Sequence, residues 1–173
     1  MSASNFQLQL LTIHWLEGIP PGIDHCAHGD VYVKIEEEEI KKECTVSATA
    51  LYLLRSLKTG FKPTPISAQL LPCCGFTMWV NRDTGKVDIF GCDAGYNWTV
   101  ELTTDGQVKH TTSKGHSAII SFAEYKQQVL AFVDAVEDFY KRSEPRVVAT
   151  DPMDREGYEA FWHEWHLLRA EWK

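Results

Sequence analysis

The spacing of hydrophobic residues changes along this chain, and the change limits the folds that the chain can adopt. In the first two thirds apolar and polar residues alternate, as in "FQLQL" and "DVYVKI", which is typical of half-buried strands. After residue 121 the apolar residues recur every third or fourth position, as on an amphipathic helix. A run of strands followed by helices predicts an α+β fold with an antiparallel sheet.

Within the strand-rich part, turns and one helix can be placed. The alternation in "FQLQLLTIHWL" changes phase at Leu10–Leu11, which predicts a β-bulge. Hairpin turns are predicted at 82–85 and at Asp105–Gly106, because Asp-Gly between alternating segments is a strong hairpin signal. Between them, "SATALYLLRSLKTG" has helical spacing and a glycine suited to end a helix. We therefore expect a meander-like antiparallel sheet with one inserted helix.

Two helices are expected at the C-terminus, both packed on the sheet. The first begins at Ser121, which forms a capping-box pattern with Glu124. The second is expected over 151–172, after a short linker at 143–150, because "DPMD" offers an N-cap, a proline at the first helical position and an early negative charge. With 173 residues, the chain is expected to form a single globular domain over 1–173.

Charge and apolar run lengths restrict the partners that we expect. The net charge is -7, and the sequence has no basic patch, so nucleic-acid binding is not expected and a basic protein partner is favoured. No run approaches 18 apolar residues, so no membrane span is predicted. The start of the chain lacks the positive residues of a signal peptide, and the odd count of five cysteines favours free thiols. We expect a cytoplasmic protein.

The stretch "FWHEWHLLR" invites a metal interpretation. His163 and His166 are three residues apart, whereas zinc peptidases use histidines four apart that flank a glutamate. His163 points away from the apolar stripe of this helix, and His166 lies at its margin. The stripe consists of Tyr158, Phe161, Trp162, Trp165, Leu168 and Trp172. We therefore expect His163 and Glu164 on an outer helix face, open to solvent or to a partner.

The loop "DHCAHGD" is the second candidate site. His25, Cys26 and His28 are able to bind a metal, and Cys73 is a distant fourth ligand, so a small zinc-dependent or thiol hydrolase that uses the His25–Asp30 loop is one alternative. Joint ligation by Cys73 and Cys74 is not expected, because adjacent side chains point in diverging directions. Fingerprints for phosphate binding, for a serine nucleophile elbow and for a dinucleotide are missing, and the leading expectation includes no cofactor.

The leading expectation is a non-enzymatic protein-binding domain with an acidic, aromatic-bearing surface. Tryptophan and tyrosine are frequent anchors of protein interfaces, and the chain has six tryptophans, more than a core accommodates with every indole N–H satisfied. The acids expected to be exposed at the partner surface are Glu36, Glu37, Glu38 and Glu39. A third alternative is a small-molecule sensor with a tryptophan-lined pocket. The sequence predicts no oligomeric state.

Several segments resemble a family of small uncharacterised bacterial proteins over most of the chain: "HGDVYVKI", "VSATALYLLRSL", "LLPCCGFTMW", "GCDAGYNWTV" and "DREGYEAFWHEWHLLR". The resemblance implies a bacterial protein, and it carries over no catalytic or binding residue. In its size and acidic character the chain is also similar to toxin-immunity proteins, which implies that it neutralises or regulates a protein partner.

Overall fold

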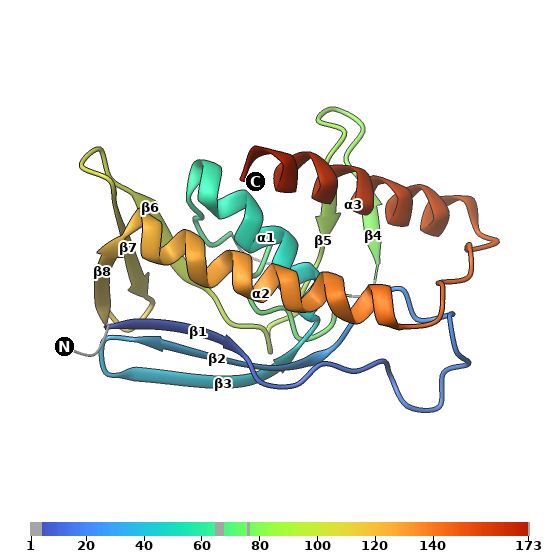
Figure 1. Cartoon of the computed structure of the whole chain (residues 1–173), viewed down its shortest axis with the longest axis horizontal. Helices are drawn as coiled ribbons and strands as arrows, with labels where there is room; N and C mark the ends of the chain where they lie inside the picture. The colour runs from blue at the N-terminus through green and yellow to red at the C-terminus, as the bar shows by residue number, and fades with distance from the viewer. Residues whose placement is uncertain (1–4, 65–67, 76, 173) are drawn as a thin grey trace.

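The structure is a computed structural model that describes residues 5–64, 68–75 and 77–172 (Figure 1). Its helices and strands confirm the α+β class. They follow one another in the order β1 (Phe6–Leu10), β2 (Gly29–Ile35), β3 (Glu38–Cys44), α1 (Val46–Thr59), β4 (Met78–Val80), β5 (Val87–Ile89), β6 (Trp98–Leu102), β7 (Gln107–Thr112), β8 (Ser117–Ser121), α2 (Phe122–Arg142) and α3 (Pro152–Glu171).

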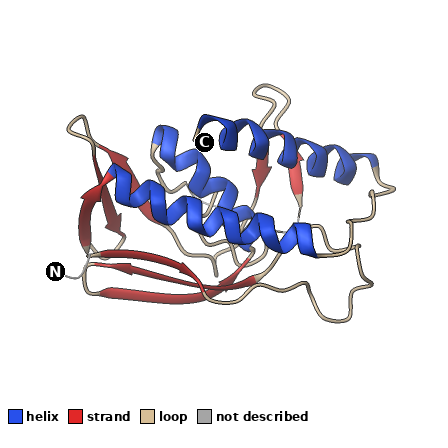
Figure 2. Ribbon diagram, viewed as in Figure 1, coloured by secondary structure: helices blue, strands red, loops and turns tan. Residues whose placement is uncertain are grey.

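The strands of the described residues are divided among three antiparallel sheets, β1-β2-β3, β4-β5 and β6-β7-β8. Within each sheet the strands follow chain order, as expected for a meander. In Figure 2 the first sheet runs along one side of the molecule beside α2, the third closes the end near the N-terminus, and β4-β5 lies against α3. The predicted turns at 82–85 and 105–106 are confirmed, because each joins the two strands of a hairpin.

The bulge predicted after β1 is also present. Leu10 pairs with Val31, but His14 pairs with His28, so the register shifts by one residue between the two pairs. The amides of Leu11 and Thr12 both donate to the carbonyl of Asp30, at 2.8 and 3.4 Å. Two residues thus face one across the ladder, which is the defining feature of a β-bulge.

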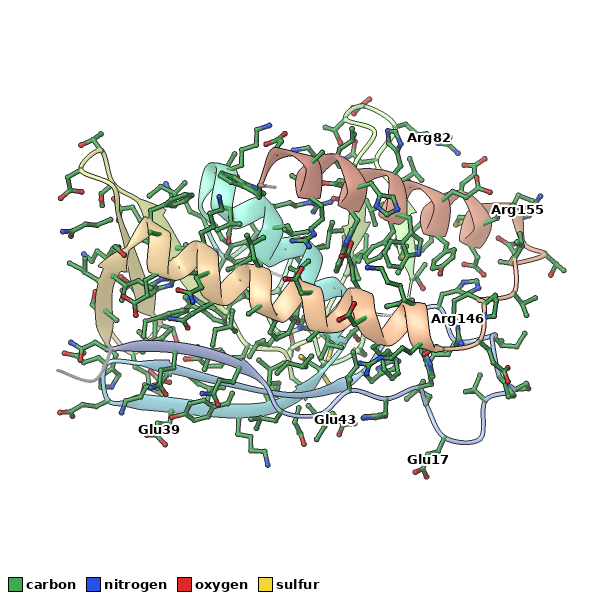
Figure 3. The ribbon with its side chains drawn as sticks, in the orientation of Figure 1. Glu17, Glu39, Glu43, Arg82, Arg146 and Arg155 are labelled. Carbon is green, nitrogen blue, oxygen red and sulfur yellow. The ribbon has the colours of Figure 1, made fainter. Side chains whose placement is uncertain are left out.

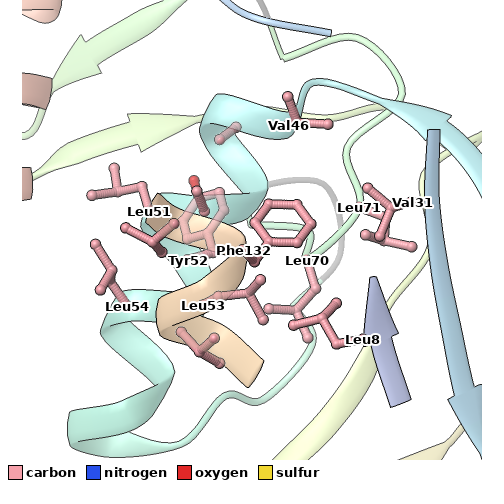
Figure 4. Close-up of a cluster of buried hydrophobic side chains, with 14 of the residues drawn as sticks. Leu8, Val31, Val46, Leu51, Tyr52, Leu53, Leu54, Leu70, Leu71 and Phe132 are labelled. Carbon is pink, nitrogen blue, oxygen red and sulfur yellow. The ribbon is translucent and has the colours of Figure 1, made fainter. Parts of the chain in front are cut away.

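Helix α1 lies at the centre of the molecule. The sequence predicts one apolar face, and the structure buries almost the whole helix, including Ala48, Leu51 and Tyr52 outside that face. Figure 4 shows Leu51, Leu53 and Leu54 among apolar side chains from β1, β2, α2 and the segment 70–71. The helix ends at Gly60, whose φ of 66° is accessible to glycine at little cost. A side chain at Gly60 would also meet the carbonyl of Val100.

Helix α2 packs along β1, which is one of the two edge strands of the first sheet. Ser121 accepts a hydrogen bond from the amide of Glu124 at 3.1 Å, which confirms the predicted N-cap. The carboxamide of Gln128 reaches β1, where its oxygen accepts from the amide of Leu8 at 2.8 Å. Its nitrogen lies 3.5 Å from the carbonyl of Phe6. The backbone edge of β1, which would otherwise be open to pairing with another chain, is therefore occupied by a side chain.

Helix α3 packs closely on β4 because of a glycine in its first half. A Cβ atom at Gly157 would lie 1.8 Å from the carbonyl oxygen of Met78, so no larger residue fits without displacement. Asp151 caps the helix by accepting from the amides of Met153 and Asp154. The indole of Trp165 donates to Glu137 of α2 at 2.8 Å, which ties the two C-terminal helices together. Among the described residues, no helix has the length and apolarity that a membrane crossing requires.

Candidate functional site

The glutamate run spans the turn between β2 and β3 and the first residues of β3, and one of its members points inward. Glu36, Glu37 and Glu39 are exposed, whereas Glu38 is buried. Burial disfavours ionisation of Glu38, but hydrogen bonds from Lys114 and the hydroxyl of Tyr96 outweigh it and lower the pKa of this carboxyl. The expectation of four exposed acids is therefore wrong for Glu38. Alternation explains the difference, because Glu38 shares the inward face of β3 with Ile40.

On α3 the two histidines and the glutamate between them differ in exposure. His163 and His166 are exposed as expected, but Glu164 is buried, so its assignment to the outer face is wrong. Both carboxylate oxygens of Glu164 accept from the Arg55 guanidinium at 2.7 Å, and one of them also accepts from the amide of Val87 at 3.0 Å. This ion pair is structural. Position 164 lies three residues after Phe161 and four before Leu168, and this helical spacing predicts burial.

The loop at 24–28 is held by hydrogen bonds and is poorly suited to nucleophilic catalysis. Asp24 accepts from the amides of Leu16 and Cys26, and it lies 3.4 Å from Nε2 of His28. Cys26 is buried, and burial raises the pKa of its thiol to about 12, so almost no thiolate exists near neutral pH. His25 is engaged elsewhere, because it donates to the carbonyl of Val147 at 2.7 Å and stacks on Tyr158.

Three thiols converge where the sequence led us to expect none. The sulfur atoms of Cys73, Cys74 and Cys92 all lie within 4.8 Å of one another, and no other such group of histidine, cysteine and acidic ligands occurs in the described part of the chain. The expected set of His25, Cys26, His28 and Cys73 does not form. The prediction that Cys73 and Cys74 diverge is wrong, because their sulfur atoms lie within 4.8 Å of each other and of the Cys92 sulfur.

The thiols of this cluster also influence one another's ionisation. A hydrogen bond with Cys92 is the largest cause that raises the pKa of Cys74, to about 11. The same bond, with support from the amide of Ala94, lowers the pKa of Cys92. Cys92 is therefore the first of this pair to become a thiolate. None of this was visible in the sequence, since it depends on how two distant segments pair.

Exposed apolar side chains gather at the end of the molecule opposite the glutamate turn. They come from the loop after Trp15, from the linker before α3 and from the first turn of α3, and we call this surface the apolar end: Leu16, Ile19, Ile23, Val147, Val148 and Met153. The loop and the linker are joined by a hydrogen bond from the amide of Val147 to the carbonyl of Gly22, at 2.7 Å. In Figure 3, Glu17 and Arg146 mark this end, and Glu39 lies toward the other.

A cleft of about 340 Å³ opens beside the apolar end. Its walls include Ile19 and Ile23 from the loop, His25, and Asp154 and Tyr158 from α3. This volume is at the small end of the range for ligand sites.

The tryptophans divide between the core and the surface. Trp98 and Trp165 are fully enclosed, and their indole nitrogens donate to His110 and Glu137. Trp15 is partly exposed beside the apolar end, where the Arg146 guanidinium lies 3.9 Å from the centre of its ring. Trp79, on β4, is 42% exposed. Most of the aromatic surplus is therefore used in packing.

Comparisons of the chain with protein-family models, with curated proteins and with solved structures found no match in any of the three.

Proposed function

We propose that this chain is a non-enzymatic protein-binding domain, regulatory or immunity-like in character, whose partner contacts the apolar end. The observation that carries the proposal is the clustering of six large apolar side chains, between 37% and 66% exposed, from three separate segments. Exposed apolar side chains gathered at one end of a protein are characteristic of interaction sites. Hydrogen bonds hold the loop and the linker in place, so the surface is formed before a partner arrives.

The charge around the apolar end favours a basic partner. The exposed acids of these segments include Glu17, Glu144 and Asp154, and they outnumber the exposed base Arg155 in the first turn of α3 (Figure 3). Arg146 is largely committed to the fold, because it lies over Trp15 and donates to the backbone of Asp24 and Glu144. With a net charge of -7, the chain would attract a basic protein over long distances.

The acidic turn has a secondary part in this proposal. Glu36, Glu37 and Glu39 add negative potential at the far end of the molecule, but two of them already have local partners. Glu36 accepts from the amide of Ser117, and Glu39 lies 3.7 Å from the amine of Lys34. We expect these acids to speed the encounter with a partner and to contribute little to its retention.

The hydrolase alternative receives no support from the geometry. Its nucleophile Cys26 is buried with a raised pKa, and the histidines beside it are held by Val147 and Asp24. One specific observation favours small-molecule binding as a second function, namely the cleft beside Tyr158. A metabolite that raised the melting temperature of the wild type but not of Tyr158→Ala would support that second function.

A matched pair of double variants tests the proposal. Ile19→Glu/Ile23→Glu changes the apolar end, whereas Ile119→Glu/Leu167→Glu places the same charges on two exposed residues of β8 and α3. Each protein is used to capture partners from a bacterial lysate, and captured proteins are quantified by mass spectrometry. We expect the wild type and the Ile119/Leu167 variant to retain the same partner, and the Ile19/Ile23 variant to lose it about 10-fold or more.

Equal capture by both double variants would contradict the proposed surface, and so would loss from both. A third variant, Glu36→Lys/Glu37→Lys/Glu39→Lys, leaves buried Glu38 intact. It should slow association with the captured partner while changing the dissociation rate little. Circular dichroism of every variant shows whether a lost partner reflects lost folding.

A further inference from the structure

The three-cysteine cluster lies in the middle of an interrupted hairpin. Leu71 and Tyr96 pair through two backbone hydrogen bonds of 3.0 and 2.9 Å, and further along the same hairpin Met78 pairs with Ile89. Six residues separate the two pairs on each arm, so the register is the same on either side of the interruption. Between the two paired regions, Cys73 and Cys74 lie at a bend, and Cys92 begins a turn that Gly95 closes.

The turn that carries Cys73 and Cys74 is fixed by one buried threonine. Thr45 donates its amide to the carbonyl of Pro72 at 2.9 Å. Its hydroxyl oxygen accepts from the amide of Gly75 at 3.2 Å. Thr45 is fully buried at the start of α1, so the turn is attached to the most enclosed helix of the fold.

The turn that carries Cys92 is fixed by a buried glutamine. The Gln69 side chain passes between two glycines, Gly91 and Gly95, where added Cβ atoms would lie 1.8 and 1.9 Å from its Oε1 atom. Its Nε2 atom donates to the carbonyl of Cys92 at 2.8 Å. The amide of Gly95 donates to the same carbonyl at 2.9 Å and closes the turn. The backbones of both turns are thus held by buried polar side chains.

Preorganised thiols at this spacing match the needs of a thiophilic cation. Around zinc, bonds of about 2.3 Å place the sulfur atoms about 3.8 Å apart. The three sulfur atoms here lie within 4.8 Å of one another, so the largest separation exceeds that spacing by about 1 Å at most. Oxygen-preferring cations such as Mg²⁺ and Ca²⁺ would not choose an all-thiolate set.

We propose that Cys73, Cys74 and Cys92 form a Zn²⁺ site with a solvent molecule as the fourth ligand. Cys73 is exposed and its two partners are partly exposed, so the ion is reached from solvent and one coordination position stays open. The ion would join the two turns across the interruption. This site is separate from the apolar end and does not depend on the proposed protein partner.

Zinc affinity of the reduced, chelator-treated full chain tests the site. The protein is titrated with Zn²⁺ in competition with a chromophoric chelator, and with Co²⁺, whose thiolate charge-transfer bands report sulfur ligation. We expect one ion per chain and sulfur-ligated cobalt. Cys73→Ser, Cys74→Ser and Cys92→Ser should each lower zinc affinity about 100-fold or more. The control is Cys26→Ser, a buried cysteine outside the cluster, which should bind zinc as the wild type does.

A second measurement uses the wild type alone and does not depend on how the variants fold. Alkylation followed by peptide mass spectrometry should show zinc protecting Cys73, Cys74 and Cys92 together. Binding of Cu⁺ without Zn²⁺ would overturn the zinc assignment. A disulfide among these cysteines that persists in mild reductant, or zinc binding that survives all three serine variants, would overturn the site itself.

Discussion

His110 is an ionisable residue held where its charge cannot be accommodated. It is fully buried on β7, it stacks on Phe6 with ring centres 3.7 Å apart, and its Nδ1 atom accepts from the indole of Trp98 at 3.2 Å. Burial lowers the pKa of this imidazole to about 3. The folded protein therefore keeps His110 neutral throughout the physiological range.

Stability should fall on mild acidification because of this histidine. The pKa of His110 is lower in the folded state than the unfolded value of about 6.5, so between these values only the unfolded chain binds the proton. The free energy of unfolding should decrease as pH falls from 6.5 toward 3, by up to about 1.4 kcal/mol per pH unit from this group. Urea titrations at pH 7, 6 and 5 measure the slope.

His110→Asn provides the comparison, because an amide oxygen can accept from Trp98 and does not titrate. The variant should lose this part of the pH dependence, although it is less stable at pH 7. If the free energy of unfolding changed with pH in the same way in both proteins, His110 would not be the cause of the pH dependence.

Inference from the sequence was wrong about the burial of two charged side chains. The sequence predicts Glu38 in an acidic turn and Glu164 on an outer helix face, and the structure buries both. Their partners, Lys114 and Arg55, are 76 and 109 residues away in sequence, and no local pattern announces them. Each glutamate nevertheless falls on the inward face of its element, which was the one readable signal.

At the scale of elements, two ion pairs join α1 to α3 and differ in their burial. Arg55–Glu164 is almost enclosed, whereas Lys58–Glu171 is 56% and 41% exposed. Glu164→Gln leaves the Arg55 charge buried without a counter-ion and should cost about 3–5 kcal/mol of unfolding free energy. Glu171→Gln should cost less than about 1 kcal/mol. Urea denaturation of both variants tests the contrast, and equal costs would contradict a structural role for Glu164.

For Gly157→Ala, the sign of the change in melting temperature tests how closely α3 packs on β4. At an exposed helical position, replacing glycine with alanine stabilises by about 1 kcal/mol. At Gly157 the new methyl group would strike the Met78 carbonyl, so Gly157→Ala should lower the melting temperature. Ala170→Gly, at an exposed position of the same helix, measures the ordinary propensity effect. If Gly157→Ala raised the melting temperature, α3 would not pack on β4 as closely as described.

The elements themselves were largely predictable, and their surroundings were not. Hairpins at 82–85 and 105–106, the bulge after Leu10 and the Ser121 cap each depend on a few adjacent residues. The enclosure of α1 and the meeting of the three thiols depend on pairings between distant segments, such as Leu71 with Tyr96. Periodicity reports which face of an element is apolar, but it does not report what covers that face.

At the scale of the whole molecule, α3 closes a structure that is otherwise incomplete. A chain that ends at Ser143 would leave β4 uncovered and Arg55 without Glu164. We expect such a chain to bind the dye ANS and to unfold over a broad range of temperature, whereas a chain that ends at Ala170 keeps the buried residues of α3 and should unfold cooperatively. Calorimetry compares the two chains. A sharp unfolding transition for the shorter chain would show that the rest of the fold does not require α3.

The equal arms of the interrupted hairpin have a consequence for how this chain can vary. Side chains in a strand alternate between two faces, so one residue added to a single arm would turn Met78 or Ile89 from the interior toward water. In homologous chains that keep this fold, changes of length at 72–77 should therefore be matched by changes at 90–95. Matched changes of this kind would appear as paired insertions or deletions on either side of the cysteines. Unmatched changes should add or remove an even number of residues, or be absorbed within the turns.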